Sequence, residues 1–121
     1  MDIEIIMGKA GEVALVDGEG ILLSTAQDAL DLIADIHYQY SCNRTILNQQ
    51  SISPDFFDLK TGLAGEILQK FTNYRMGLGI VGEFASYNSK SLLDFIYECN
   101  KGSHVFFAAN EQEAVKWMEN V

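Results

Sequence analysis

Hydrophobic and polar positions alternate at the start of the chain. Apolar residues recur at every second position between Ile3 and Met7, which is typical of a strand with one buried face. Residues 8–11 contain two glycines and predict a turn, and residues 13–16 are continuously apolar. We therefore expect two antiparallel strands joined as a hairpin. A short apolar step at residues 21–23 predicts, at most, a brief third strand.

A first helix is predicted over residues 25–40, where apolar residues recur at helical spacing. Thr25, followed three residues later by Asp28, resembles a capping box. The aspartates on the opposite side are interpreted as a solvated face, because a hard cation needs several oxygens converging on one point. The positions expected to face the core are Ala26, Ala29, Leu30, Ile33, Ile36, His37 and Tyr40.

A second, longer helix is predicted from residue 54 to residue 75. Ser53 is a good N-cap, and Pro54 suits the first helical position. Gly62 weakens a helix interior by about 1 kcal/mol relative to alanine, so a turn or kink is expected between residues 58 and 62. The expected apolar stripe is Phe56, Leu59, Leu63, Ile67, Phe71 and Tyr74.

Three further strands are predicted at residues 44–47, 76–81 and 104–108, each followed by a helix. Residues 76–81 are all apolar or glycine, which is typical of a strand covered on both faces. The order predicts a single α/β domain over residues 1–121. In this domain an antiparallel hairpin is followed by alternating helices and strands, and four helices cover a mostly parallel central sheet.

Gly77, Gly79 and Gly82 spell the GxGxxG pattern of dinucleotide-binding turns. That fingerprint requires its glycines in the turn between a strand and a helix, whereas the first two lie within the predicted strand. We expect a structural role instead. Gly77 and Gly79 leave space on one face for a helix to pack closely, while Leu78 and Ile80 fill the other face.

The charge balance narrows the classes of partner. The 121 residues include 17 acidic and 8 basic ones, which gives a net charge of −9. No cluster of Lys and Arg along the sequence would neutralise a phosphate backbone or an anionic bilayer, so neither nucleic acid nor membrane is an expected partner. No apolar run approaches the roughly 20 residues of a membrane helix. A cytoplasmic protein that binds a protein partner or a small molecule is expected.

Neither metal nor cofactor chemistry is suggested by the sequence. Cys42 and Cys99 have no CxxC neighbour and belong to no His/Cys cluster, so two reduced thiols are expected rather than a zinc site. Nucleophile-elbow, P-loop and HExxH patterns do not occur. No catalytic residue is therefore predicted, and a protein without enzymatic activity is favoured.

Polar residues without an evident packing role gather at the expected kink, where Asp58, Lys60 and Thr61 lie close together. Free N–H groups at a helix start attract an anion such as phosphate, so this turn is a candidate binding surface. The alternative is that Asp58 and Thr61 only cap a second helix start. Gly62 and Gly65 permit close approach of another backbone, either from this chain or from a second subunit in a homodimer.

A small-molecule site at the sheet edge is the alternative function. Ligands of open parallel sheets bind beyond the carboxyl ends of the strands, where the loops after residues 47, 82 and 108 should converge. A nucleotide- or metabolite-binding protein, or an enzyme, would use this edge. The residues offered there are Asn48, Glu83, Tyr87, Ser89 and Asn110.

The order of elements resembles the STAS domain of anti-sigma-factor antagonists and sulfate transporter tails. In that family a phosphorylatable Ser or Thr begins the second long helix in an Asp-Ser-Ser-Gly-like turn. Asp58-Leu59-Lys60-Thr61-Gly62-Leu63 occupies the comparable place here, one residue longer and with Lys60 unmatched. The resemblance implies a STAS-like fold and a regulatory module that binds a protein partner and is switched by phosphorylation of Thr61.

A more specific resemblance is to a small bacterial family known as domain of unknown function 4180. It is carried by residues 56–71 with Asn73-Tyr74-Arg75, and by Asp94-Phe95-Ile96-Tyr97-Glu98 with Asn100-Lys101-Gly102. This likeness spans the full length. It implies a bacterial, cytoplasmic protein and no particular activity.

Overall fold

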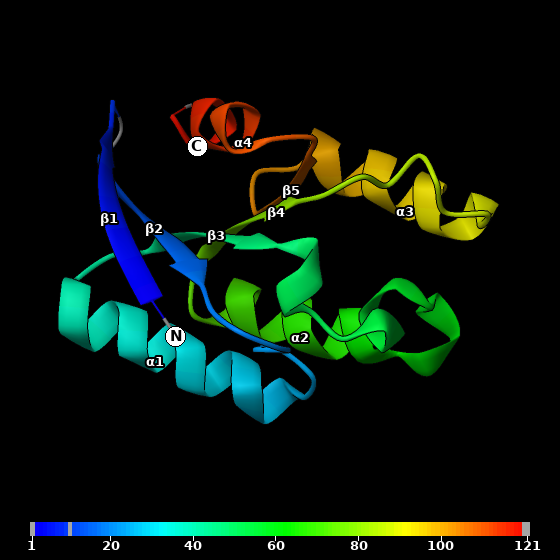
Figure 1. The fold of residues 1–121 in the computed structure, drawn as a ribbon, viewed down its shortest axis with the longest axis horizontal. Coiled ribbons are helices and arrows are strands. Elements are labelled where there is room, and N and C mark those ends of the chain that lie inside the picture. Colours follow the sequence, from blue (N-terminus) through cyan, green and yellow to red (C-terminus); the bar gives the residue numbers. More distant parts are fainter. Residues whose placement is uncertain (1, 10, 120–121) are drawn as a thin grey trace.

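A five-stranded sheet forms the centre of the protein (Figure 1), for which a computed structural model describes residues 2–9 and 11–119. The strands lie in sequence order, with β1 and β2 antiparallel and β2 to β5 mutually parallel. The strands are β1 (Asp2–Gly8), β2 (Gly11–Asp17), β3 (Arg44–Asn48), β4 (Gly77–Val81) and β5 (Val105–Ala108). The α-helices are α1 (Ala26–Tyr40), α2 (Leu63–Asn73), α3 (Lys90–Lys101) and α4 (Glu111–Met118).

This arrangement confirms the predicted α/β fold, with an antiparallel hairpin followed by alternating helices and strands. Right-handed crossovers that all step in the same direction place α1, α2 and α3 on one side of the sheet, where their buried residues join one large core. Helix α4 follows the last strand and covers the opposite face with a smaller core. Figure 1 shows α1 and α2 below the sheet, α4 above it and α3 beside β5.

The predicted close approach of a helix to the glycine-bearing face of β4 is confirmed. A Cβ atom added to Gly79 would lie 3.3 Å from Ile46 Cγ1 and 3.4 Å from both Ala114 Cβ and Met118 Cε. Gly79 is therefore the position over which α4 packs. On the other face, Leu78 and Ile80 are buried in the larger core.

Helix α1 begins with the predicted capping box. Thr25 Oγ1 accepts from the Asp28 N–H at 3.0 Å, and the Asp28 carboxylate accepts in return from the Thr25 N–H at 3.1 Å. The backbone N–H of Ser24 also donates to Asp28 at 2.9 Å, and this bond is the main cause of a lowered pKa for that carboxyl. His37 is exposed, so its assignment to the core-facing stripe is wrong. The buried positions are Ala29, Leu32, Ile33 and Ile36, and position 37 lies beyond the edge of that stripe.

The predicted helix over residues 54–75 is not continuous. It consists of a 3₁₀ turn at Pro54–Phe57, a second at Leu59–Thr61, and then α2. The expected kink has become a full break, because Gly62 adopts a left-handed conformation with φ of 77°. Such a φ interrupts a helix and suits glycine. Phe56 and Phe57, at the end of the first 3₁₀ turn, are both buried.

The brief third strand is reduced to a single bridge. Leu23 pairs with Ile52, and the N–H groups of Leu22 and Leu23 both donate to the Ser51 carbonyl. This contact ties the loop before α1 to the loop after β3. It lies outside the five-stranded sheet, so residues 21–23 do not form a strand of the sheet.

Replacing Gly79 by valine tests the packing of α4. The added carbons have no room between β3 and α4, so we expect the free energy of unfolding to fall by about 1–3 kcal/mol, measured by urea denaturation. Gly65→Ala is the matched control, since Gly65 lies in α2 with nothing within 4 Å of an added Cβ, and alanine should stabilise that helix by about 0.5–1 kcal/mol. An unchanged stability for Gly79→Val would contradict the close contact.

Replacing Asp28 by alanine tests the capping box. At pH 7 the loss of these hydrogen bonds should cost about 1 kcal/mol of unfolding free energy. The folded-state pKa of Asp28 is lowered from 3.8, so its contribution is present above that value and is lost as the pH falls through the folded pKa. The difference between the variant and the wild type should therefore vanish at the acid end of a pH series. Asp31→Ala, on the same helix, should change stability little at any pH.

Candidate functional site

The Asp58–Thr61 turn lies at the surface between the buried phenylalanines and α2. Asp58 caps the second 3₁₀ turn, because its Oδ1 accepts from the Lys60 N–H at 3.3 Å. The side chains of Asp58, Lys60 and Thr61 are all exposed. The carboxylate is thus fixed by its own turn, while the lysine and threonine beside it face solvent.

The Thr61 hydroxyl holds the break in the chain together. Thr61 Oγ1 lies 2.7 Å from the carbonyl oxygen of Asp55 and 2.9 Å from that of Asp58, to which it can donate its one proton. The same oxygen accepts from the N–H of Leu63, the first residue of α2, at 3.2 Å. One side-chain oxygen therefore connects both 3₁₀ turns to the start of α2. These are the contacts expected of the capping alternative.

No other segment packs closely on Gly62 or Gly65. Within the described part of the chain, a Cβ added at either position would meet no heavy atom within 4 Å. The prediction that these glycines admit a neighbouring element of the same chain is therefore wrong. The left-handed φ explains Gly62, and nothing in the structure explains the glycine at position 65. A second subunit at this surface stays a prediction.

The turn faces the start of α3 across a small pocket of about 370 Å³. Asp58 and Lys60 line one side, and Ser89 and Ser91 line the other. Ser89 is the N-cap of α3, with its Oγ accepting from the Leu92 N–H at 3.2 Å. Residues proposed for the two alternative sites therefore share one surface depression, although they lie about thirty positions apart in sequence.

The carboxyl edge of the sheet is partly filled by a side chain that the sequence did not single out. Gln49, directly after β3, donates to the Tyr87 hydroxyl and accepts from the Glu83 N–H at 3.1 Å. It passes over Gly82, where an added Cβ would overlap the Gln49 side chain. Asn48 ends β3 opposite Val81. Of the residues predicted for a ligand site at this edge, Tyr87 and Glu83 do lie near each other. The side chain of Gln49 lies between them and bonds to both.

Beside the Gln49 side chain, the ends of β4 and β5 flank a crevice of about 560 Å³. The chain leaves β4 toward α3 and leaves β5 toward α4 on the opposite face, which is the kind of branching point where α/β ligands bind. Glu83 is the one charged residue among those that line the crevice: Gly82, Glu83, Phe84, Ala85, Phe107, Ala108 and Ala109. The nearby Asn110 caps α4 through the Glu113 N–H at 2.9 Å, so it is already engaged in the fold.

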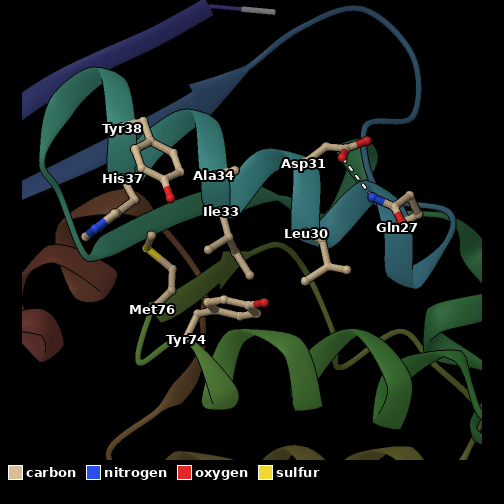
Figure 2. A pocket seen from close by; sticks show the side chains of 9 residues that line it. All are labelled: Gln27, Leu30, Asp31, Ile33, Ala34, His37, Tyr38, Tyr74 and Met76. Atoms are coloured by element: carbon tan, nitrogen blue, oxygen red, sulfur yellow. Dashed lines mark hydrogen bonds between the residues drawn. The ribbon is translucent and has the colours of Figure 1, made fainter.

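A third hollow lies between α1 and α2 and was not predicted (Figure 2). Its volume is about 390 Å³. Tyr38 and Tyr74 flank it, with 83% and 61% of their surfaces exposed, and Ile33 lies between them in the view. Asp31 accepts from Gln27 Nε2 at 2.9 Å at the far end. Tyr74 was expected on a buried stripe, and only the packing of two helices far apart in sequence leaves it at a groove.

Both cysteines are free thiols, and neither is exposed. Cys42 is buried, and its Sγ lies 3.2 Å from the carbonyl oxygens of Glu12 and Arg44. Burial raises the pKa of the Cys99 thiol, which disfavours the thiolate. Among residues 2–9 and 11–119, no group of three or more His, Cys, Asp or Glu side chains is placed to hold a metal ion. No helix in the same residues has the length and apolar character to cross a bilayer.

Comparison with known proteins identifies the kind of domain and no activity. Residues 9–118 match the family described as Domain of unknown function (DUF4180). No curated protein and no solved structure matches the chain. The match covers strands β2 to β5 and all four helices but not β1, and it includes each surface described above.

Proposed function

The chain belongs to the DUF4180 family, whose description assigns no activity, and we propose that it is a non-catalytic regulatory module. In this proposal a protein partner binds the segment from Asp58 to Gly65, hereafter the Asp58–Gly65 turn, which joins the Asp58–Thr61 turn to the first residues of α2. The observation that supports this is the position of the Thr61 hydroxyl. It is exposed, yet it holds together both 3₁₀ turns and the start of α2. A chemical change at this one oxygen would alter the shape of the whole turn.

Phosphorylation of Thr61 is the switch that we propose. Transfer of a phosphoryl group from a nucleoside triphosphate to Oγ1 releases the nucleoside diphosphate and the hydroxyl proton. The side chain thereby loses the only proton that it can donate and gains a charge of about −1.5 to −2. The new oxygens would then lie against the carbonyl oxygens of Asp55 and Asp58, which repel them. The turn would have to open, and a partner that recognises one form would not recognise the other. The order of elements, which resembles that of STAS domains, supports the same assignment.

The partner surface is charged on both sides of Thr61. Asp55, Asp58 and Glu66 are exposed acids, and Lys60 is an exposed base among them. A partner that presents basic side chains would complement this turn and the overall charge of −9. Binding should therefore weaken as salt concentration rises.

Three substitutions at Thr61 test the switch. Thr61→Ser keeps the hydroxyl, Thr61→Ala removes it, and Thr61→Glu adds a negative charge. Loss of the hydroxyl should destabilise the protein by about 1 kcal/mol and should speed hydrogen exchange at the Thr61 and Gly62 amides, which bond to Asp58 and Leu59. Serine should behave as the wild type in exchange and in partner capture, whereas alanine and glutamate should lose capture.

Two readouts separate the parts of this proposal. Equal capture by all three variants, with faster exchange in alanine and glutamate, would show that the turn opens without affecting a partner, and the proposed switch would be wrong. Equal exchange in all three would remove the physical basis of the switch.

The crevice between β4 and β5 supports the second candidate, a small-molecule binding protein. A panel of nucleotides and metabolites should then include a compound that raises the melting temperature of the wild type. Ala109→Trp, at an exposed position of the crevice wall, should abolish that rise without lowering the melting temperature of the free protein. A panel without effect on the wild type would contradict this candidate.

A further inference from the structure

The fold brings both arginines of the chain to one place. Arg44 and Arg75 line a pocket of about 320 Å³ at the amino-terminal edge of the parallel strands, opposite the edge that carries the crevice. His104, just before β5, lines the same pocket. The remaining lining residues are Asn43, Thr72, Gly77 and Ser103, so hydroxyl and amide groups surround the basic ones and no carboxylate is among them. In a chain of net charge −9 this is an unusual concentration of donors.

Arg75 has a backbone conformation that its side chain disfavours. Its φ is 55°, in the left-handed region that glycine occupies most readily. It is the residue after the C-cap of α2, where its N–H donates to Thr72 and the N–H of Met76 donates to Phe71. These two hydrogen bonds form the Schellman motif that ends many helices, and glycine is the usual residue at the position of Arg75. An arginine here costs stability that glycine would not.

The arginine side chain does not recover that cost through a partner. In the described residues the Arg75 guanidinium takes part in no ion pair or side-chain hydrogen bond. A positive charge near the C-terminal end of α2 interacts favourably with the helix dipole, but any basic residue would provide this interaction, and it weakens beyond the last turn. Backbone strain at a residue that lines a pocket together with a second arginine and a histidine is typical of a binding site.

We propose that this pocket, formed by Arg75, Arg44 and His104, binds a tetrahedral oxyanion, the phosphate group of a small molecule. A planar guanidinium presents paired donors that match phosphate oxygens, and bonds of this kind are stronger than those between neutral groups. Thr72 and Ser103 supply hydroxyl donors for the remaining oxygens. The wall is firm, because the backbone carbonyls of Asn43 and His104 accept from Gly77 at 2.9 Å and from Leu78 at 3.0 Å.

The site is independent of the proposed partner surface. It uses no residue of the Asp58–Gly65 turn, and it lies at the C-terminal end of α2 whereas the turn lies at the N-terminal end. Failure of the phosphate-binding proposal would therefore not contradict the proposed partner surface, and failure of the partner surface would not contradict phosphate binding.

The test uses inorganic phosphate as the probe, against sodium chloride at equal ionic strength so that general screening is the same in both. Phosphate should raise the melting temperature of the wild type, because a ligand that binds only the folded state stabilises it. Amide signals of residues 75–77 and 103–104 should shift in a two-dimensional NMR titration. Absence of a phosphate-specific effect in both measurements would overturn the proposal.

Arg75→Gly gives the distinguishing result. Glycine relieves the left-handed strain, so the melting temperature in chloride should rise by about 3–6 °C. The same variant should bind phosphate at least about tenfold more weakly, since a charge-assisted hydrogen bond is lost. A variant that is both more stable and less able to bind would show that the arginine serves the ligand. If Arg75→Gly instead lowers the melting temperature in chloride, or binds phosphate as tightly as the wild type, the proposal is wrong.

Two further variants control for charge. Lys90→Ala removes one positive charge from an exposed position on α3, and it should bind phosphate as the wild type does. Arg75→Lys keeps the charge and the strain but not the paired donors, so its affinity should lie between those of the wild type and Arg75→Gly. Equal weakening by Lys90→Ala would mean that net charge, and not this pocket, governs the effect, and would also overturn the proposal.

Discussion

The close contact between α4 and the centre of the sheet is the constraint on which the rest of the architecture depends. β4 lies between β3 and β5, and its two faces have opposite requirements. One face carries Leu78 and Ile80 into the core formed with α1, α2 and α3, while Gly79 leaves the other face open for Ala114 and Met118 of α4. A short helix can cover that face only because it comes so near. The placement of α4 then separates the exits of β4 and β5, which forms the crevice at their ends.

The irregular segment before α2, residues 54–62, is held in place by apolar packing on one side and by hydrogen bonds on the other. Phe56 and Phe57 anchor it from beneath, and Phe57 stacks on Tyr87 with ring centres 5.5 Å apart. The hydroxyl of Thr61 joins its turns from above. The buried apolar anchor and these exposed hydrogen bonds together give the turn a defined shape. An exposed element of defined shape is what recognition by another protein requires.

The free edge of β5 is closed by a side chain. Asn100 on α3 donates through Nδ2 to the Phe107 carbonyl at 3.2 Å and accepts from the Phe107 N–H at 2.8 Å, as a neighbouring strand would. Natural sheets commonly protect their edges against pairing with other chains. This contact also fixes the end of α3 against the sheet.

The sequence by itself determined the types and order of the elements, the hairpin, the capping of α1, and the glycine face of β4. These depend on residues within one or two turns of each other, and local periodicity records them. Only the tertiary structure decided that the stretch before α2 breaks at Gly62, because burial of both Phe56 and Phe57 depends on a cluster that includes Tyr87. Contacts across long separations also placed Gln49 over Gly82 and brought Arg44 and Arg75 to the same pocket. No local pattern encodes such a pair, since each residue is compatible with many neighbours until the sheet brings one of them near.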